Sequence, residues 1–101
     1  MRALLVALIV AVPGIAHAAK GVVAWTGRCD YFAVQTPMGF AVLEWYGGEL
    51  PVKGAVVVGD FETYGMTDIH YVTTGDSTTV WVEEYFLSRS SAAEKLAEKC
   101  R

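Results

Sequence analysis

Short runs of alternating apolar and polar side chains, separated by turn residues, fill most of the chain after residue 18. Alternation with a period of two places the apolar residues on one face of a β-strand. The runs predict strands at 21–26, 31–36, 40–46, 55–62, 66–72 and 79–86. Short strands at this spacing predict an all-β fold, a small five- to six-stranded antiparallel barrel of OB-like or SH3-like topology.

Local patterns refine this prediction at three points. Within 40–46, Leu43 shares a face with Ala41 and Trp45, so this side is predicted to face the core and Glu44 to be solvated. Residues 36–39 read Thr-Pro-Met-Gly, with Pro second and Gly fourth, which predicts a type I turn inside a hairpin. A glycine within a strand run, Gly59, predicts a bulge or a sharp bend.

The period changes near the C-terminus. Ala92, Leu96 and Cys100 recur at intervals of four, which is the apolar stripe of a helix. We therefore expect a C-terminal helix over about 88–100, packed on the barrel. Residues 91–94 read Ser-Ala-Ala-Glu and resemble a capping box, which predicts Ser91 as the residue that caps the helix.

The first 18 residues have the three parts of a secretory signal. Arg2 is followed by an apolar run at 3–12, a Pro-Gly break and an Ala-His-Ala site. The run is too short for a membrane span, which needs about 20 apolar residues. The sequence therefore predicts cleavage after Ala18, no membrane span afterwards, and one exported domain, 19–101, that is periplasmic or secreted. A buried N-terminal strand or helix is the alternative.

The two cysteines, Cys29 and Cys100, both lie in the predicted exported domain. Export brings thiols into an oxidising compartment, where disulfides form and persist. With two cysteines there is one possible pairing within the chain. We expect a Cys29–Cys100 disulfide that ties the helix to the barrel; two free buried thiols are the alternative.

Charge limits the possible partners. The chain has a formal net charge of −3, and Lys53 is the only basic residue between Cys29 and Leu87. Nucleic acids and anionic membrane surfaces are bound through Lys and Arg, so neither is an expected partner. The expected partners are an envelope protein, or a small ligand that is cationic or rich in hydroxyl groups.

Aromatic residues mark a candidate contact surface. Trp81, Glu83 and Tyr85 are spaced by two on one predicted strand and would share a face, while Tyr46 and Tyr64 lie at strand ends. Aromatic side chains exposed together are enriched in binding sites. The alternative is that these rings fill the core of a small barrel.

Two pairs of polar residues could support chemistry. Asp68 and His70 would share a strand face and could hold a metal, but a catalytic zinc usually needs three protein ligands and a third is not evident. Asp60 and Glu62 would also share a face, as an acid–base pair requires. Solvated surface residues are the default explanation of both pairs, so no catalytic residue, metal or cofactor is assigned.

Several segments carry a resemblance. They are residues 31–40 (YFAVQTPMGF), 43–48 (LEWYGG), 58–61 (VGDF), 64–65 (YG) and 80–83 (VWVE). This pattern resembles a family of small exported bacterial β-barrel proteins without a defined activity. The resemblance implies a fold and brings no catalytic residues, because a fold does not determine a function.

Together these patterns favour an exported, monomeric, non-enzymatic binding module. Three features support this interpretation: the sequence contains no recognisable catalytic motif, the domain is small, and it combines aromatic residues with an excess of acidic ones. The alternative is a small envelope enzyme, a hydrolase or a metal-dependent enzyme, that uses Asp68 and His70 or Asp60 and Glu62. A pocket that gathers three of these groups would favour the enzyme.

Overall fold

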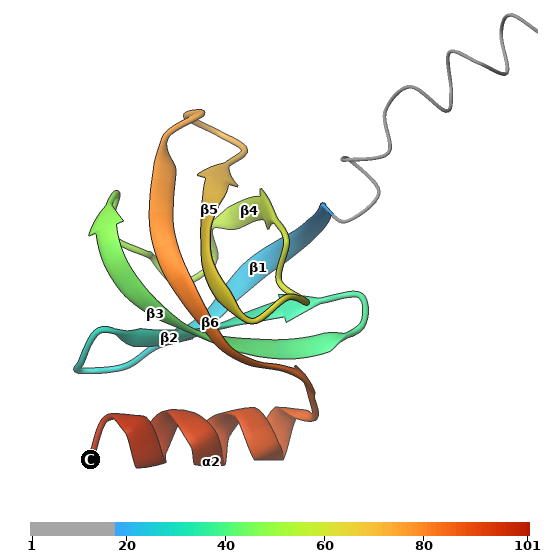
Figure 1. The fold of residues 1–101 in the computed structure, drawn as a ribbon, viewed down its shortest axis with the longest axis vertical. Helices are drawn as coiled ribbons and strands as arrows, with labels where there is room; N and C mark the ends of the chain where they lie inside the picture. The colour runs from blue at the N-terminus through green and yellow to red at the C-terminus, as the bar shows by residue number, and fades with distance from the viewer. Residues whose placement is uncertain (1–17) are drawn as a thin grey trace, which may run out of the picture.

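The computed structural model describes residues 18–101, so residues 1–17, which carry most of the predicted signal peptide, lie outside the described residues. Six strands form a barrel, and one helix lies against its outside (Figure 1). The elements are β1 (Ala19–Thr26), β2 (Tyr31–Thr36), β3 (Gly39–Gly48), β4 (Val56–Gly59), β5 (Gly65–Tyr71), β6 (Ser77–Leu87) and α2 (Arg89–Lys99). The predicted all-β barrel with a C-terminal helix is confirmed.

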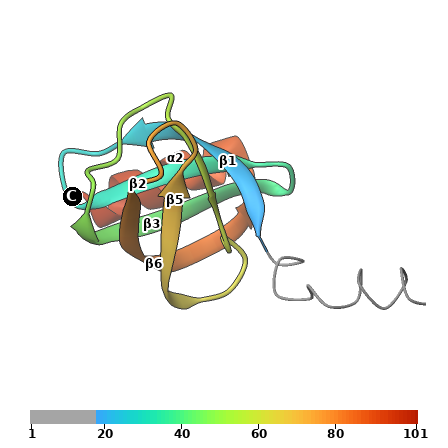
Figure 2. The ribbon, with the colours of Figure 1, turned by 90° about the horizontal axis from the view of Figure 1, so that it is seen from above.

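The barrel is closed and every strand pair is antiparallel. The order around it is β1-β2-β3-β6-β5-β4, and β4 returns to pair with β1. β1, β2 and β3 are successive neighbours and β4 lies beside β1, which is the arrangement of a Greek key. Figure 2 shows the barrel from above, with α2 running along the side formed by β2 and β3. Closure gives each strand a partner on both sides, which removes the open edges of a flat sheet.

The interior is filled by inward-facing apolar side chains from all six strands. They are Val23, Phe32, Val34, Ala41, Leu43, Val57, Ile69, Tyr71, Val80 and Val82, together with Phe61 from the connection after β4. The alternation of β6 illustrates the cause, because Val80 and Val82 are fully buried while Trp81 between them is exposed. The period-two pattern of the sequence thus determines which residues enter the core.

The fourth strand is shorter than predicted. β4 ends at Gly59, and the chain leaves the ladder before Asp60. The close approach of β5 explains the glycine: a Cβ atom at Gly59 would lie 2.7 Å from Cγ2 of Ile69. Residues 60–64 then form an irregular connection, from which Phe61 enters the barrel.

A methyl group at Gly59 should therefore destabilise the barrel. We expect Gly59→Ala to lower the free energy of unfolding by about 1–3 kcal/mol, the usual cost of overpacking a core. Gly47→Ala is the matched control, because nothing lies within 4 Å of a Cβ atom there. It should be neutral or stabilise by up to about 1 kcal/mol. Urea titrations of the two variants compare them directly; equal stabilities would contradict the proposed contact.

Both faces of β3 are buried along part of its length. Leu43 faces the barrel interior as predicted, but Phe40 and Val42 on the other face are also buried, with Ala92 and Leu96 of α2 packed over them. A strand between a core and a covering helix reads as a continuous apolar run. The helix thus forms a second, smaller core outside the barrel.

The helix cap lies three residues before the predicted one. Ser88 is the N-cap, with φ −73° and ψ 166°, and its side chain accepts a hydrogen bond from the Ser91 amide. The predicted capping box at 91–94 is therefore wrong. The reason is that β6 continues to Leu87, so the helix starts directly after it, and Ser91 contributes its backbone N–H to the first turn.

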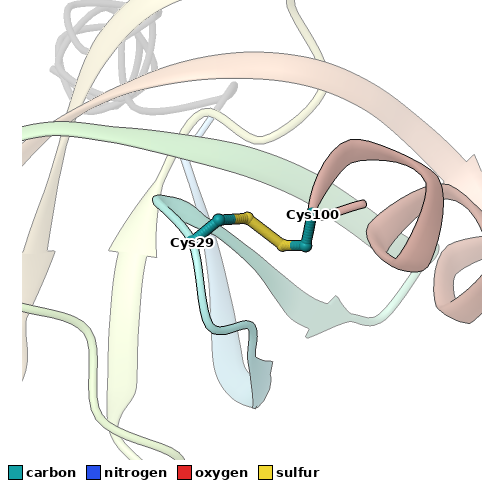
Figure 3. Close-up of a disulfide and its surroundings, with 2 residues drawn as sticks. All are labelled: Cys29 and Cys100. Atoms are coloured by element: carbon teal, nitrogen blue, oxygen red, sulfur yellow. A yellow bond between two sulfur atoms is a disulfide. The ribbon is translucent and has the colours of Figure 1, made fainter.

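The predicted disulfide is present. Cys29 and Cys100 are joined across a sequence separation of 71 residues, with a Cα–Cα distance of 5.4 Å. Figure 3 shows that the bond links the loop between β1 and β2 to the C-terminal end of α2. It anchors the end of the helix opposite to the one that follows β6 in the chain.

Candidate functional site

The outer face of β6 presents an exposed tryptophan to solvent. Trp81 is 40% exposed, and it pairs with Glu44 on β3 and with Met66 on β5, which is 53% exposed. The next outward pair is Thr79 and Asp68, in which the Thr79 hydroxyl donates to the Asp68 carboxylate at 2.7 Å. We call the surface formed by these five residues the Trp81 face.

The predicted grouping of Trp81, Glu83 and Tyr85 on one face is wrong for Tyr85, which lies on the side of the barrel core. Leu43 pairs with Val82 but its neighbour Val42 pairs with Glu84, so Glu83 is an extra residue in β6. Such a β-bulge shifts the alternation of the residues that follow it. Tyr85 consequently packs against the barrel core, and Glu83 faces α2, where its carboxylate lies 3.1 Å from the Lys99 ammonium.

Two of the predicted tyrosines meet beyond the bulge. The rings of Tyr64 and Tyr85 are 4.7 Å apart between centroids, and Phe86 packs edge-on against Tyr85 at 4.8 Å. Phe86 is 57% exposed and has a φ of 61°, a left-handed conformation that is unfavourable for a bulky residue. Phe86 gave no signal in the sequence, because its exposure depends on the irregular end of β6.

The remaining predicted residue, Tyr46, borders the Trp81 face. It is exposed and lies at a second register shift, between Trp45, which pairs with Val80, and Gly47, which pairs with Thr79. It therefore lies toward the opposite end of β6 from the Tyr64–Tyr85 pair. The five predicted contact residues thus lie in three places. Trp81 has Tyr46 at its border, Glu83 faces α2, and Tyr64 packs against Tyr85.

Negative charge surrounds these aromatic residues. Burial, followed by a hydrogen bond and charge repulsion from Glu44, raises the pKa of Tyr31, and the charge of Glu84 raises the pKa of Tyr64. The two ion pairs within residues 18–101 join Lys95 to Glu98 and Lys99 to Glu83. Glu44, Asp68 and Glu84 therefore add uncompensated charge to this side of the barrel.

The candidate catalytic pairs do not gather into a pocket. Asp68 and His70 are both exposed on β5, and no group of three potential metal ligands occurs within residues 18–101. Asp60 and Glu62 lie beyond β4, so the strand face that they were predicted to share does not exist there. The Asp60 carboxylate instead accepts a hydrogen bond from the Glu62 amide at 3.1 Å.

Hollows lie elsewhere on the surface. One, of about 220 Å³, is at a barrel end between the β1–β2 loop and the β3–β4 loop and includes Asp30, Tyr31, Trp45 and Leu50. A second, of about 300 Å³, is an apolar groove beside α2, lined by Trp25, Gly27, Ala93, Leu96, Ala97 and Cys100. Sequence reasoning missed both because their walls come from segments far apart in the chain. Within the described part of the chain, no helix has the length and apolar character of a membrane span.

The fold and this surface define a class of protein: a small closed Greek-key barrel with a disulfide-anchored C-terminal helix and an acidic, aromatic outer face. No protein-family model, no curated protein and no solved structure matches the chain. The structure contains the barrel that the resemblance implies. Because no comparison finds a match, no family is identified.

Proposed function

We propose that this protein is an exported, non-enzymatic binding module that contacts its partner through the Trp81 face. The observation that carries the proposal is the 40% exposure of Trp81 on a regular part of β6. Tryptophan is among the residues that contribute most to binding energy at protein interfaces. Met66 beside it adds an adaptable apolar contact.

The backbone under this surface supports the proposal. Trp81 pairs with Glu44 on one side and Met66 on the other, so the strand that carries the indole is held in the middle of a three-strand sheet. A pre-formed contact surface loses little conformational entropy on binding. Val80 and Val82 on the reverse face fill the barrel, so the core does not depend on the indole.

Export is the other part of the proposal. The Cys29–Cys100 bond is consistent with an oxidising compartment, because disulfides are rare in reducing cytosol. The signal pattern at 1–18 supports the same location. A partner is therefore sought in the periplasm or outside the cell.

Substitution of Trp81 tests the proposal. Trp81→Ala should change the free energy of unfolding by less than about 1 kcal/mol, because surface substitutions are usually mild. The same change should weaken capture of a partner from envelope extract about tenfold or more, as expected for a residue that dominates an interface. Thermal unfolding and quantitative pull-down measure the two effects.

Met38→Ala is the control, because Met38 is an exposed apolar residue in the β2–β3 turn, at the opposite end of β3 from the stretch around Glu44 that pairs with Trp81. It should leave both stability and capture unchanged. A loss of about 3–5 kcal/mol in Trp81→Ala, the cost of a core tryptophan, would remove Trp81 from the contact surface.

A further inference from the structure

Trp81 is flanked by carboxylates on both neighbouring strands. Glu44 is its direct partner on β3, and Asp68 lies two residues along β5 from its direct partner Met66. Directly opposed residues have Cβ atoms about 4.5–5.5 Å apart, and diagonal neighbours about 7–8 Å apart. A group that rests on the Trp81 indole is therefore within reach of two acidic side chains.

Nearby basic side chains do not neutralise these acids. The Lys99 ammonium lies 5.8 Å from the ring of Tyr31, the β2 partner of Glu44, but it is paired with the Glu83 carboxylate at 3.1 Å. Neither Glu44 nor Asp68 takes part in an ion pair within residues 18–101. The charge of Glu84 is the main cause of the raised pKa of Tyr64, and the charge of Glu44 adds to burial in raising the pKa of Tyr31.

Resting on the proposed function, we infer that the Trp81 face binds a basic polypeptide segment and seats one of its Arg or Lys side chains on the Trp81 ring, beside Glu44. Tryptophan gives the strongest cation–π interaction of the aromatic residues. A guanidinium can stack on the ring and donate hydrogen bonds to a carboxylate at the same time. Met66 is placed to contact the aliphatic part of the same side chain.

The shape of the surface favours a polypeptide over a small free cation. The two hollows described above do not include Trp81, Met66 or Asp68 in their walls. A free cation on an open sheet face remains largely hydrated, and its interaction is worth only about 0.5–1 kcal/mol. A polypeptide segment adds further contacts with Met66 and with the exposed Tyr46 at the border.

The test compares three synthetic peptides of equal length, with Arg, Gln or Glu at the same alternating positions among Ser and Leu residues. Calorimetric titration into the disulfide-bonded protein should detect binding of the Arg peptide only, weakening steeply as salt increases. Glu44→Gln should weaken this binding about five- to tenfold and reduce its salt dependence. Glu94→Gln on α2 removes the same charge elsewhere and should leave binding unchanged.

The outcomes separate this inference from the proposed function. Equal weakening by Glu44→Gln and Glu94→Gln would mean that only net charge matters, and would overturn the inference. The inference would also be overturned if the Gln peptide or a neutral oligosaccharide bound as tightly as the Arg peptide. If Trp81→Ala weakened the binding of that neutral ligand, the proposed function would stand. Absence of peptide binding overturns the inference, and capture that is insensitive to Trp81→Ala overturns the proposed function. Should Glu44→Gln unfold, Asp68→Asn replaces it.

Discussion

Cys100→Ser is expected to lower the free energy of unfolding by about 2–5 kcal/mol, the usual range for loss of a native disulfide from a small domain. The bond closes a separation of 71 residues, for which the chain-entropy relation gives about 4 kcal/mol. A domain of this size buries only about 60% of its unfolded surface, so a loss of that magnitude is a large share of its stability. Guanidinium titration of variant and wild-type protein measures the difference.

The effect should be localised as well as global. Without the bond, α2 is held to the barrel by the small core that Ala92 and Leu96 form with Phe40 and Val42. Hydrogen exchange in α2 should therefore accelerate more than exchange in β3 and β6. Reduction of the wild-type protein is the control and should reproduce the loss. A reducing agent that destabilised the Cys100→Ser variant equally would contradict the assignment to the bond.

Phe61→Ala is expected to cost about 3–5 kcal/mol, the range for truncation of a buried aromatic residue. Phe61 is 0% exposed, and with Phe32 it is one of the two largest fully buried side chains. It enters the barrel from the connection between β4 and β5, where β4 pairs with only His70 and Tyr71 of β5. Truncation should therefore open a cavity in the barrel beside β1, where a Cβ atom at Gly21 would lie 3.4 Å from the Phe61 ring.

Phe86→Ala is the matched control, because Phe86 is 57% exposed. This variant should lose less than about 1 kcal/mol, as surface substitutions usually do. Chemical denaturation of the two variants provides the comparison. If Phe61→Ala were as stable as Phe86→Ala, the connection after β4 would not contribute to the core as described.

The bulge in β6 shows where reasoning from the sequence reached its limit. Val80 and Val82 lie opposite Trp81, as alternation in a regular strand requires. Alternation then failed at Tyr85, since the extra residue Glu83 appears only when β6 is aligned with β3. The proposed contact surface therefore keeps Trp81 but not Tyr85.

Burial of Phe40 and Val42 had a similar cause. Their apolar character was evident in the sequence, but the alternation assigned the core to the side of Leu43. The helix that covers the other side comes from residues about fifty positions later in the chain. Which face a distant helix covers depends on the closure of the barrel and on the disulfide, and neither is a local property.

The sequence by itself determined the six strands, the C-terminal helix and the pairing of Cys29 with Cys100, because alternation, helical period and cysteine number are carried by neighbouring residues or by simple counting. The tertiary structure alone decided the order of strands, the length of β4 and the surroundings of Trp81. These features depend on which backbones approach each other: Gly59 against Ile69, and β6 between β3 and β5. Contacts between segments distant in the chain are set by packing, which no local pattern encodes.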